Sequence, residues 1–239
     1  MPISAGPLAT LRRRLLNALL PQDCLLCLAA ASDALLCPTC AAGLPGLPAP
    51  CCPRCALPGG NGECCGRCQR RPPAFDAMLA LHPYAFPVDR LIQGLKYRGE
   101  LSVAGHFAAA LTTACAPLGA DLVVPMPLHP SRLAARGFNQ AMEIARALAP
   151  RLGIPLAARA CTRERATVPQ EGLSLAERRR NLRGAFACRA DFAGFTGRHL
   201  LLIDDVATTG ASADECARTL KRHGAARVSV VVVARTLLD

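Results

Sequence analysis

Two adjacent carboxylates and a hydroxyl-rich turn form the segment of the chain that is best suited to chemistry. An apolar run ends at Asp204 and Asp205, and the turn A-T-T-G-A-S follows at 207–212. Neighbouring aspartates at the end of a strand can accept hydrogen bonds from the vicinal hydroxyls of a ribose. The N–H groups of the turn, at the start of a helix, can surround one phosphate, and Gly210 lets the backbone approach it. The segment therefore predicts a site for a ribose phosphate.

The plain alternative for this segment is a strand, a turn and a helix whose first turn is capped by an aspartate. That arrangement accounts for one carboxylate. It does not account for a second carboxylate beside the first, nor for the three hydroxyls of Thr208, Thr209 and Ser212. The chain also lacks the G-x-x-x-x-G-K-[ST] pattern, which excludes a Walker-type phosphate loop.

Cysteines with metal-ligand spacing crowd the first third of the chain. The sequence has 14 cysteines, and ten of them lie between positions 24 and 68. Each C-x-x-C pair aims two thiolates at one metal, and two pairs complete a tetrahedral zinc site with no open coordination position. The spacing predicts one or two structural zinc ions, with sequential and cross-braced pairing both open. The four pairs are Cys24/Cys27, Cys37/Cys40, Cys52/Cys55 and Cys65/Cys68.

A disulfide framework is the alternative for these cysteines, but it requires an oxidising compartment, and no targeting signal is recognisable. A redox C-x-x-C is disfavoured because no strand–helix–strand pattern surrounds the pairs. Cys51 and Cys64 each directly precede a C-x-x-C pair, and no role is assigned to them. The other four cysteines are scattered and are expected in the core as small apolar residues; they are Cys115, Cys161, Cys188 and Cys216.

The charge of the chain favours anionic partners. The net charge is +11 at pH 7, and Lys96 and Lys221 are the only lysines among 28 basic residues. Arginine binds phosphate oxygens with two parallel hydrogen bonds, so this composition suits nucleotides or nucleic acid. General solubility is the alternative explanation of the charge.

The first 23 residues are expected to form an amphipathic helix, because Leu8, Leu11, Leu15 and Leu19 share one helical face. Asn17 interrupts the apolar run that a signal peptide would need. No segment approaches the roughly 20 apolar residues of a membrane span. We expect a cytoplasmic chain whose first helix packs on the protein, with a membrane-surface helix as the alternative.

Two blocks of the sequence are expected to fold around these residues. A double zinc ribbon is expected at 24–72, and Pro72-Pro73 marks its boundary with a domain at 73–239. That domain alternates strand patterns with helix patterns, which predicts an α/β fold with a parallel sheet and helices on both faces. Ligands of such sheets bind at the carboxyl ends of the strands. The expected strands are 78–81, 121–125, 199–204 and 228–234, and the expected helices are 88–97, 101–116, 139–152 and 212–223.

The segment 199–212 resembles the phosphoribosyl pyrophosphate (PRPP) motif of type I phosphoribosyltransferases, with Ala207 smaller than the apolar residue usual there. The resemblance implies contacts of Asp204 and Asp205 with the ribose hydroxyls and a magnesium ion on the pyrophosphate. It also implies that the 5′-phosphate is bound by Ala207, Thr208, Thr209, Gly210, Ala211 and Ser212.

Three further segments extend the resemblance. V-P-M-P at 124–127 stands where the family places a pyrophosphate loop, which implicates Met126 and Pro127. R-L-A-A-R-G-F-N-Q at 132–140 and L-K-Y-R-G at 95–99 add Arg136 and Lys96 as ligand contacts. A helix cap at Asn139 and a surface position for Lys96 are the plain alternatives. An active-site loop in the family corresponds to the stretch with Arg163, Arg165, Thr167, Gln170, Leu173, Arg178 and Asn181.

With the zinc-knuckle front, these segments resemble the ComF/GntX family over nearly the whole chain. If the site is catalytic, the resemblance implies displacement of magnesium pyrophosphate from C1 of the ribose, with Asp204, Asp205 and Arg178 as the catalytic set. For Arg178 a solvated charge run is the alternative. The ComF type also implies a link to DNA uptake and other competence proteins. A non-catalytic protein that binds single-stranded DNA or senses PRPP is the alternative, and no acceptor pocket is recognisable at 73–100.

Overall fold

The computed structural model describes residues 22–237 except 33, 60, 166–181 and 190–191. The chain divides into two compact units, 1–44 and 45–239. The predicted helix at 1–23 lies almost wholly outside the described residues, and the predicted domain boundaries after 23 and 72 stay predictions. None of the helices in the described part of the chain has the length and hydropathy needed to cross a bilayer.

The first unit is small and carries the first four-cysteine cluster. Strands β1 (Gln22–Asp23) and β2 (Ala30–Ser32) pair antiparallel, and helix α2 (Pro38–Ala42) follows. Helix α2 begins at Pro38 because a proline at the first helical position has no N–H to leave unpaired.

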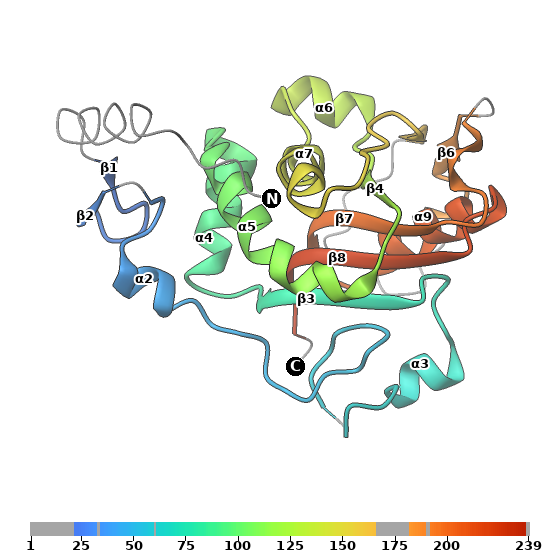
Figure 1. Ribbon diagram of the computed structural model, residues 1–239, viewed down its shortest axis with the longest axis horizontal. Coiled ribbons are helices and arrows are strands. Elements are labelled where there is room, and N and C mark those ends of the chain that lie inside the picture. Colours follow the sequence, from blue (N-terminus) through green and yellow to red (C-terminus); the bar gives the residue numbers. More distant parts are fainter. Residues whose placement is uncertain (1–21, 33, 60, 166–181, 190–191, 238–239) are drawn as a thin grey trace. The chain divides into compact units, whose positions relative to one another are not determined.

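The second unit is built on a parallel sheet of order β3-β8-β7-β4 (Figure 1). Each strand is an apolar run, and the two central strands are buried on both faces, as parallel sheets require. All three neighbour pairs are parallel, so the carboxyl ends of the strands share one edge. The strands are β3 (Ala77–Pro83), β4 (Leu122–Pro125), β7 (His199–Ala207) and β8 (Arg227–Arg235).

Helices cover the sheet on both faces. Helix α9 (Ala211–Arg222) buries the stripe Ala213, Cys216, Ala217 and Leu220, whose spacing places them on one helical face against Leu200 and Leu202 of β7. Leu201 and Ile203 alternate to the opposite face, where α5 (Ser102–Cys115) and α7 (Gln140–Leu152) pack (Figure 1). The predicted parallel α/β sheet is confirmed.

Shorter elements complete the second unit, and several of them were not predicted. The predicted helix at 88–97 is α4 (Val88–Gln93) followed by a π-helix. Helix α6 and the hairpin of β5 and β6 have no counterpart among the predicted elements. The remaining bounds are α3 (Gly66–Arg70), π-helix η1 (Gly94–Arg98), η2 (Ala116–Leu118), α6 (Pro130–Arg136), β5 (Cys161–Arg163), β6 (Phe186–Cys188) and η3 (Ala193–Phe195).

Candidate functional site

The acidic pair lies at the carboxyl end of β7, which runs on through Ala207. The backbone N–H of Asp205 donates to Oδ1 of Asp204 at 2.9 Å, and the N–H of Val206 donates to Oδ1 of Asp205 at 2.7 Å. Each carboxylate is thus oriented by the N–H of the following residue. Asp204 is half-buried and Asp205 is buried.

Lys96 completes this acidic centre. Its Nζ lies 2.9 Å from Oδ2 of Asp205, and the exposed fractions of the two side chains are 19% and 10%. Burial raises the pKa of Asp204 to about 7, and the charge of Asp205 acts in the same direction. Burial opposes the charge of Lys96, but the two carboxylates outweigh it and raise the pKa of Lys96. Near neutral pH the centre therefore holds a lysine–aspartate ion pair beside a carboxyl group that is poised to titrate.

Lys96 reaches the centre from an unusual local structure. It sits in the π-helix at Gly94–Arg98, and π-helical turns inside helices occur frequently at functional sites. The turn ends at Gly99, whose φ of +68° is in the left-handed region that favours glycine. The plain alternative of a surface position for Lys96 is wrong, because the side chain is largely buried and paired.

The turn at 207–212 connects β7 with α9 and surrounds a small cavity, which Asp204 also lines. Gly210 has a φ of +77° and precedes the first residue of α9. The hydroxyl of Thr209 accepts from the N–H of Ala211 at 3.3 Å, which closes the turn. Backbone N–H groups at the start of a helix and the side chain of Asp204 thus line one cavity, and N–H groups in this position can bind a phosphate.

The predicted pyrophosphate segment at 124–127 lies beside the acidic pair. The N–H of Met126 donates to the carbonyl of Ile203 at 2.8 Å, directly before Asp204. Asn139 caps α7 by accepting from the N–H of Ala141 at 3.0 Å, so the cap is confirmed. The amide of Asn139 also donates to the carbonyl of Met126 at 3.0 Å, and this bond ties the two predicted segments together.

Lys96 also lines a cavity of about 400 Å³. This volume falls within the roughly 300–1,000 Å³ of small-molecule sites. Arg136 lies 5.5 Å from the ring centroid of Tyr97 and donates to Gln140 at 2.7 Å, which fixes its guanidinium. Lys96 and Arg136 were predicted as ligand contacts, whereas Tyr97 and Phe138, the aromatic part of this wall, were not. The lining residues are Lys96, Tyr97, Gly99, Arg132, Ala135, Arg136 and Phe138.

The arginines of the predicted active-site loop fall partly within the described residues. Arg163 ends β5, is 8% exposed and stacks over Phe186 with its guanidinium carbon 5.6 Å from the ring centroid. Burial and then the charge of Arg132 lower the pKa of Arg163, while Asp204 opposes the shift. Arg165 is exposed. Arg178 lies outside the described residues, as do Thr167, Gln170, Leu173 and Asn181.

The eight C-x-x-C cysteines form two clusters, Cys24/Cys27/Cys37/Cys40 and Cys52/Cys55/Cys65/Cys68, with the sulfurs of each cluster within 4.8 Å of one another. The pairing is therefore sequential. The Cys27–Cys37 and Cys55–Cys65 sulfurs are 3.7 Å apart. That is roughly the edge of a tetrahedron with Zn–S bonds of about 2.3 Å. The N–H of Cys40 donates to Cys37 and that of Cys65 donates to Cys52, so both sites fit structural zinc.

Arg235, which was not predicted from the sequence, also contacts the turn. It ends β8, is fully buried, and its guanidinium donates to the carbonyl of Cys55 at 3.0 Å and of Ala207 at 2.8 Å. The only signal for it in the sequence is an arginine at the end of the wholly apolar run V-V-V-V-A.

Two family models match the chain. Residues 15–69 match a double zinc ribbon domain, and residues 134–237 match a phosphoribosyl transferase domain. DNA utilization protein YhgH of Escherichia coli K12 is 36% identical over 194 residues, covering 78% of this chain and 84% of that protein. Competence protein F of Haemophilus influenzae is 30% identical over 175 residues, covering 70% and 76%. The purine phosphoribosyltransferase structure from Pyrococcus horikoshii Ot3 covers 66% of this chain and 87% of its own, at 15% identity and a TM-score of 0.36.

Proposed function

Because the chain belongs to the ComF family, together with DNA utilization protein YhgH and competence protein F, we propose that its C-terminal domain binds PRPP or a related ribose phosphate. The observation that carries the proposal is a series of contacts at the sheet edge. Asp204 lines the cavity of the turn at 207–212, the next residue, Asp205, pairs with Lys96, and Lys96 lines the larger cavity. Phosphate, sugar and pyrophosphate follow one another in the same order in PRPP.

Each part of the arrangement suits one part of the ligand. The N–H groups of the turn and the first turn of α9 bind the 5′-phosphate. The carboxylates of Asp204 and Asp205 accept hydrogen bonds from the 2′- and 3′-hydroxyls. Lys96, Arg132 and Arg136 line the cavity in which the pyrophosphate lies, and arginine pairs well with its oxygens. Arg163, Arg165 and Arg178 stay candidates for a closing loop.

If the domain is catalytic, its residues act mainly by binding and orienting the ligand. The bond that breaks joins C1 of the ribose to a pyrophosphate oxygen, and charge builds on that leaving group. Lys96 and Arg136 stabilise this charge, while the acidic pair holds the sugar ring in place. Magnesium bound to the ligand oxygens would neutralise part of the same charge, and the carboxylate of Asp204 is a suitable hard oxygen ligand for it. The acceptor that would attack C1 of the ribose is unassigned. A PRPP sensor would use the same binding residues without the displacement of pyrophosphate.

The biological setting we propose is the handling of DNA in the cytoplasm during uptake or utilisation, in association with other competence proteins. The names of the relatives support it, and so does the net charge of +11. Exposed aromatic side chains favour direct contact with single-stranded DNA as a second candidate function. Phe86 is 74% exposed and Tyr97 is 75% exposed, and bases stack on such rings.

Calorimetric titration of magnesium PRPP into zinc-loaded protein tests the first proposal. The control is a double variant, Asp204→Asn with Asp205→Asn. Saturable binding that the variant loses supports the ribose phosphate site, and no binding to the wild type overturns it. A parallel titration with single-stranded DNA separates the second candidate. Contacts with about five phosphates make affinity fall steeply with salt, and replacing Tyr97 and Phe86 with alanine lowers it further.

A further inference from the structure

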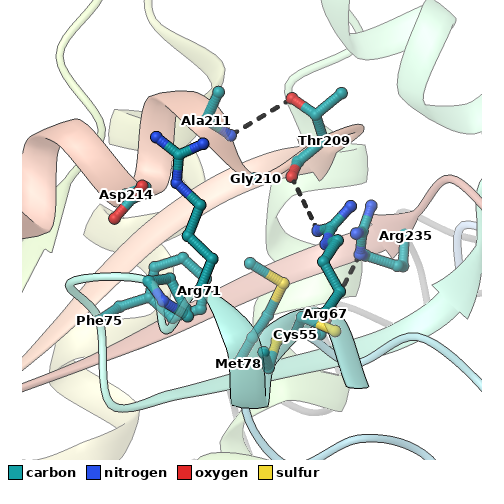
Figure 2. Close-up of a pocket in the computed structure, with 12 residues that line it drawn as sticks. Cys55, Arg67, Arg71, Phe75, Met78, Thr209, Gly210, Ala211, Asp214 and Arg235 are labelled. Carbon is teal, nitrogen blue, oxygen red and sulfur yellow. Dashed lines mark hydrogen bonds between the residues drawn. The ribbon is translucent and has the colours of Figure 1, made fainter. Parts of the chain in front are cut away.

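The second zinc cluster is joined to the phosphate-binding turn by one buried guanidinium. Arg235 is fully buried at the end of β8, in register with Ala207 at the end of β7. Its Nε donates to the carbonyl of Cys55, and its Nη1 donates to the carbonyls of Ala207, Thr208 and Thr236. One rigid planar group therefore holds Cys55, a zinc ligand of the ribbon (Figure 2), and also the first two residues of the turn.

A second arginine repeats this connection from the ribbon itself. Arg67 lies in helix α3, between the ligands Cys65 and Cys68, and donates to the carbonyl of Thr209 at 3.4 Å (Figure 2). Three successive carbonyls of the turn, at 207–209, are thus held by Arg235 and Arg67. With their oxygens turned toward the arginines, the peptide groups of the turn are held in one orientation for a phosphate.

The ribbon is also packed into the core below the turn. Ala56, directly after Cys55, is 4% exposed and belongs to the same apolar cluster as Phe75 and Met78. The N–H of Met78 donates to the carbonyl of Pro53, inside the Cys52–Cys55 knuckle, at 3.2 Å. Loss of the metal would therefore disturb residues on which the turn rests.

The arginines here belong to the zinc site and do not form a separate anion site. A zinc ion with four thiolates carries a net charge of roughly −2, which the guanidiniums of Arg67 and Arg235 face across a shared cavity (Figure 2). That cavity measures about 20 Å³, enough for about one water molecule but too small for a phosphate. Asp214 adds a carboxylate to the cavity wall, which disfavours an anion there.

We propose that zinc binding at the second cluster and ligand binding at the 207–212 turn are thermodynamically coupled through Arg67 and Arg235. Zinc holds Cys55 and the α3 helix in place, these hold the two arginines, and the arginines hold the turn. The coupling must be reciprocal, so a ligand in the turn strengthens zinc binding at this cluster. The first cluster lies in the other compact unit and serves as an internal control. The inference deepens the proposed function, but its first test requires no ligand.

Hydrogen exchange of the turn tests the structural half of the proposal in the full chain. Cys65→Ser weakens the second cluster, and Cys27→Ser is the matched change in the first. We expect the amides at 207–212 to exchange at least about fivefold faster in Cys65→Ser and at the wild-type rate in Cys27→Ser. Exchange in β4 at 122–125 reports whether the sheet stays folded. Equal exchange of the turn in the two variants overturns the proposal.

Zinc loss in the presence of ribose 5-phosphate tests reciprocity. A chelator and N-ethylmaleimide are added together, and mass spectrometry follows alkylation of each cluster. Ribose 5-phosphate should slow alkylation of Cys52–Cys68 by about fivefold or more and leave Cys24–Cys40 unchanged. Arg67→Gln should reduce this protection, because only the link through Arg235 remains, whereas Arg70→Gln, which replaces an exposed arginine of the same helix, should keep it in full. Arg235 is not replaced, because loss of its guanidinium would leave buried carbonyl groups without a donor and is expected to destabilise the fold.

The two proposals fail in different ways. If calorimetry detects no binding of ribose 5-phosphate or PRPP while Cys65→Ser still loosens the turn, the proposed function is overturned and the coupling stands. If ribose 5-phosphate binds but protects neither cluster, or protects both equally, the coupling is overturned and the ligand site stands.

Discussion

Lys96 and Asp205 form an ion pair of 2.9 Å in which the side chains are only 19% and 10% exposed. The other lysine of the chain makes a pair of similar length, because Nζ of Lys221 lies 2.7 Å from Oδ1 of Asp76. There the exposed fractions are 33% and 28%. The two pairs therefore differ mainly in burial, which decides how much the loss of one partner costs.

Lys96→Met should destabilise the protein more than Lys221→Met does. Removal of Lys96 leaves Asp205 buried without its partner, next to a second carboxylate, and we expect a loss of about 3 kcal/mol in the free energy of unfolding. Lys221→Met, which breaks the more exposed pair, should lower the free energy of unfolding by less than about 1 kcal/mol. Urea unfolding of both variants measures the difference. Adding Asp205→Asn to Lys96→Met should restore much of the stability, and equal losses for the two lysines would contradict this interpretation.

The parallel sheet was predictable because its central strands are apolar runs bounded by turns. Leu200–Ile203 and Val228–Ala234 can only be buried, and the helix between them, α9, carries a clear apolar stripe. Helix α6 at Pro130–Arg136 was missed because it buries no residue and so has no apolar stripe. Its signals were the proline at its first position and Gly137 after its end.

The candidate site was predictable where one short segment carries the chemistry, as at 204–212. Contacts between distant segments could not be predicted from the sequence. Nothing in the sequence indicates that Arg235 turns inward to the carbonyls of Cys55 and Ala207, because the register of β7 and β8 creates that contact. Likewise, the place of Lys96 beside Asp205 depends on a π-helix that spacing did not reveal.

Ligand binding should weaken as the pH falls through about 7. Burial raises the pKa of Asp204 to about 7, and only the ionised carboxylate accepts from both ribose hydroxyls. The ligand favours the ionised form, so affinity for ribose 5-phosphate should rise between pH 6 and 8 and level off above that. The phosphate group titrates near pH 6 as well, so 2-deoxyribose 5-phosphate serves as the control. A ratio of the two affinities that does not change with pH would count against the contact.

Asp204→Asn should stabilise the fold while abolishing that ligand contact. Since the pKa of Asp204 is raised in the folded state, ionisation of Asp204 disfavours folding, and this cost is absent at low pH and grows as the pH rises toward 7. At pH 8 we expect a gain on the order of 1–2 kcal/mol, reduced by the partial exposure of the side chain. Near pH 4 the gain should vanish. Thermal unfolding at the two pH values measures it, and a destabilised variant at pH 8 would contradict the assignment.

Gly210→Ala should weaken phosphate binding through the backbone alone. Gly210 has a φ of +77°, and a Cβ there would meet Met78 and Phe75 only at ordinary contact distances of 3.8–3.9 Å. The cost is therefore conformational, about 1 kcal/mol. The turn can relieve it by rotating its N–H groups, so affinity for inorganic phosphate should fall severalfold. Gly210→Asn is the control, because asparagine tolerates positive φ and should lose less. Equal losses would point to a steric cause.

Cys161 and Cys188 should form a disulfide when the protein is oxidised with diamide. Their sulfurs lie 2.9 Å apart on facing strands, β5 and β6. The N–H of Arg189 donates to the carbonyl of Ala160, which makes the two cysteines a non-hydrogen-bonded pair. Cα atoms in such pairs are about 4.5 Å apart, within the range that a disulfide spans.

The reaction should be slow at neutral pH, because both thiols are poor nucleophiles. Hydrogen bonding to Cys188 favours the thiolate of Cys161, but Cys216 and burial outweigh it and raise the pKa of Cys161. The hydrogen bond to Cys161, with burial, raises the pKa of Cys188. The bridge would close the segment that contains Arg163 and Arg165, with an expected gain of about 3 kcal/mol. Peptide mapping without reductant identifies the bond, and thermal unfolding measures the gain. A bridge from Cys161 to Cys216 instead would contradict the prediction, because Cys216 also lies within hydrogen-bonding distance of Cys161.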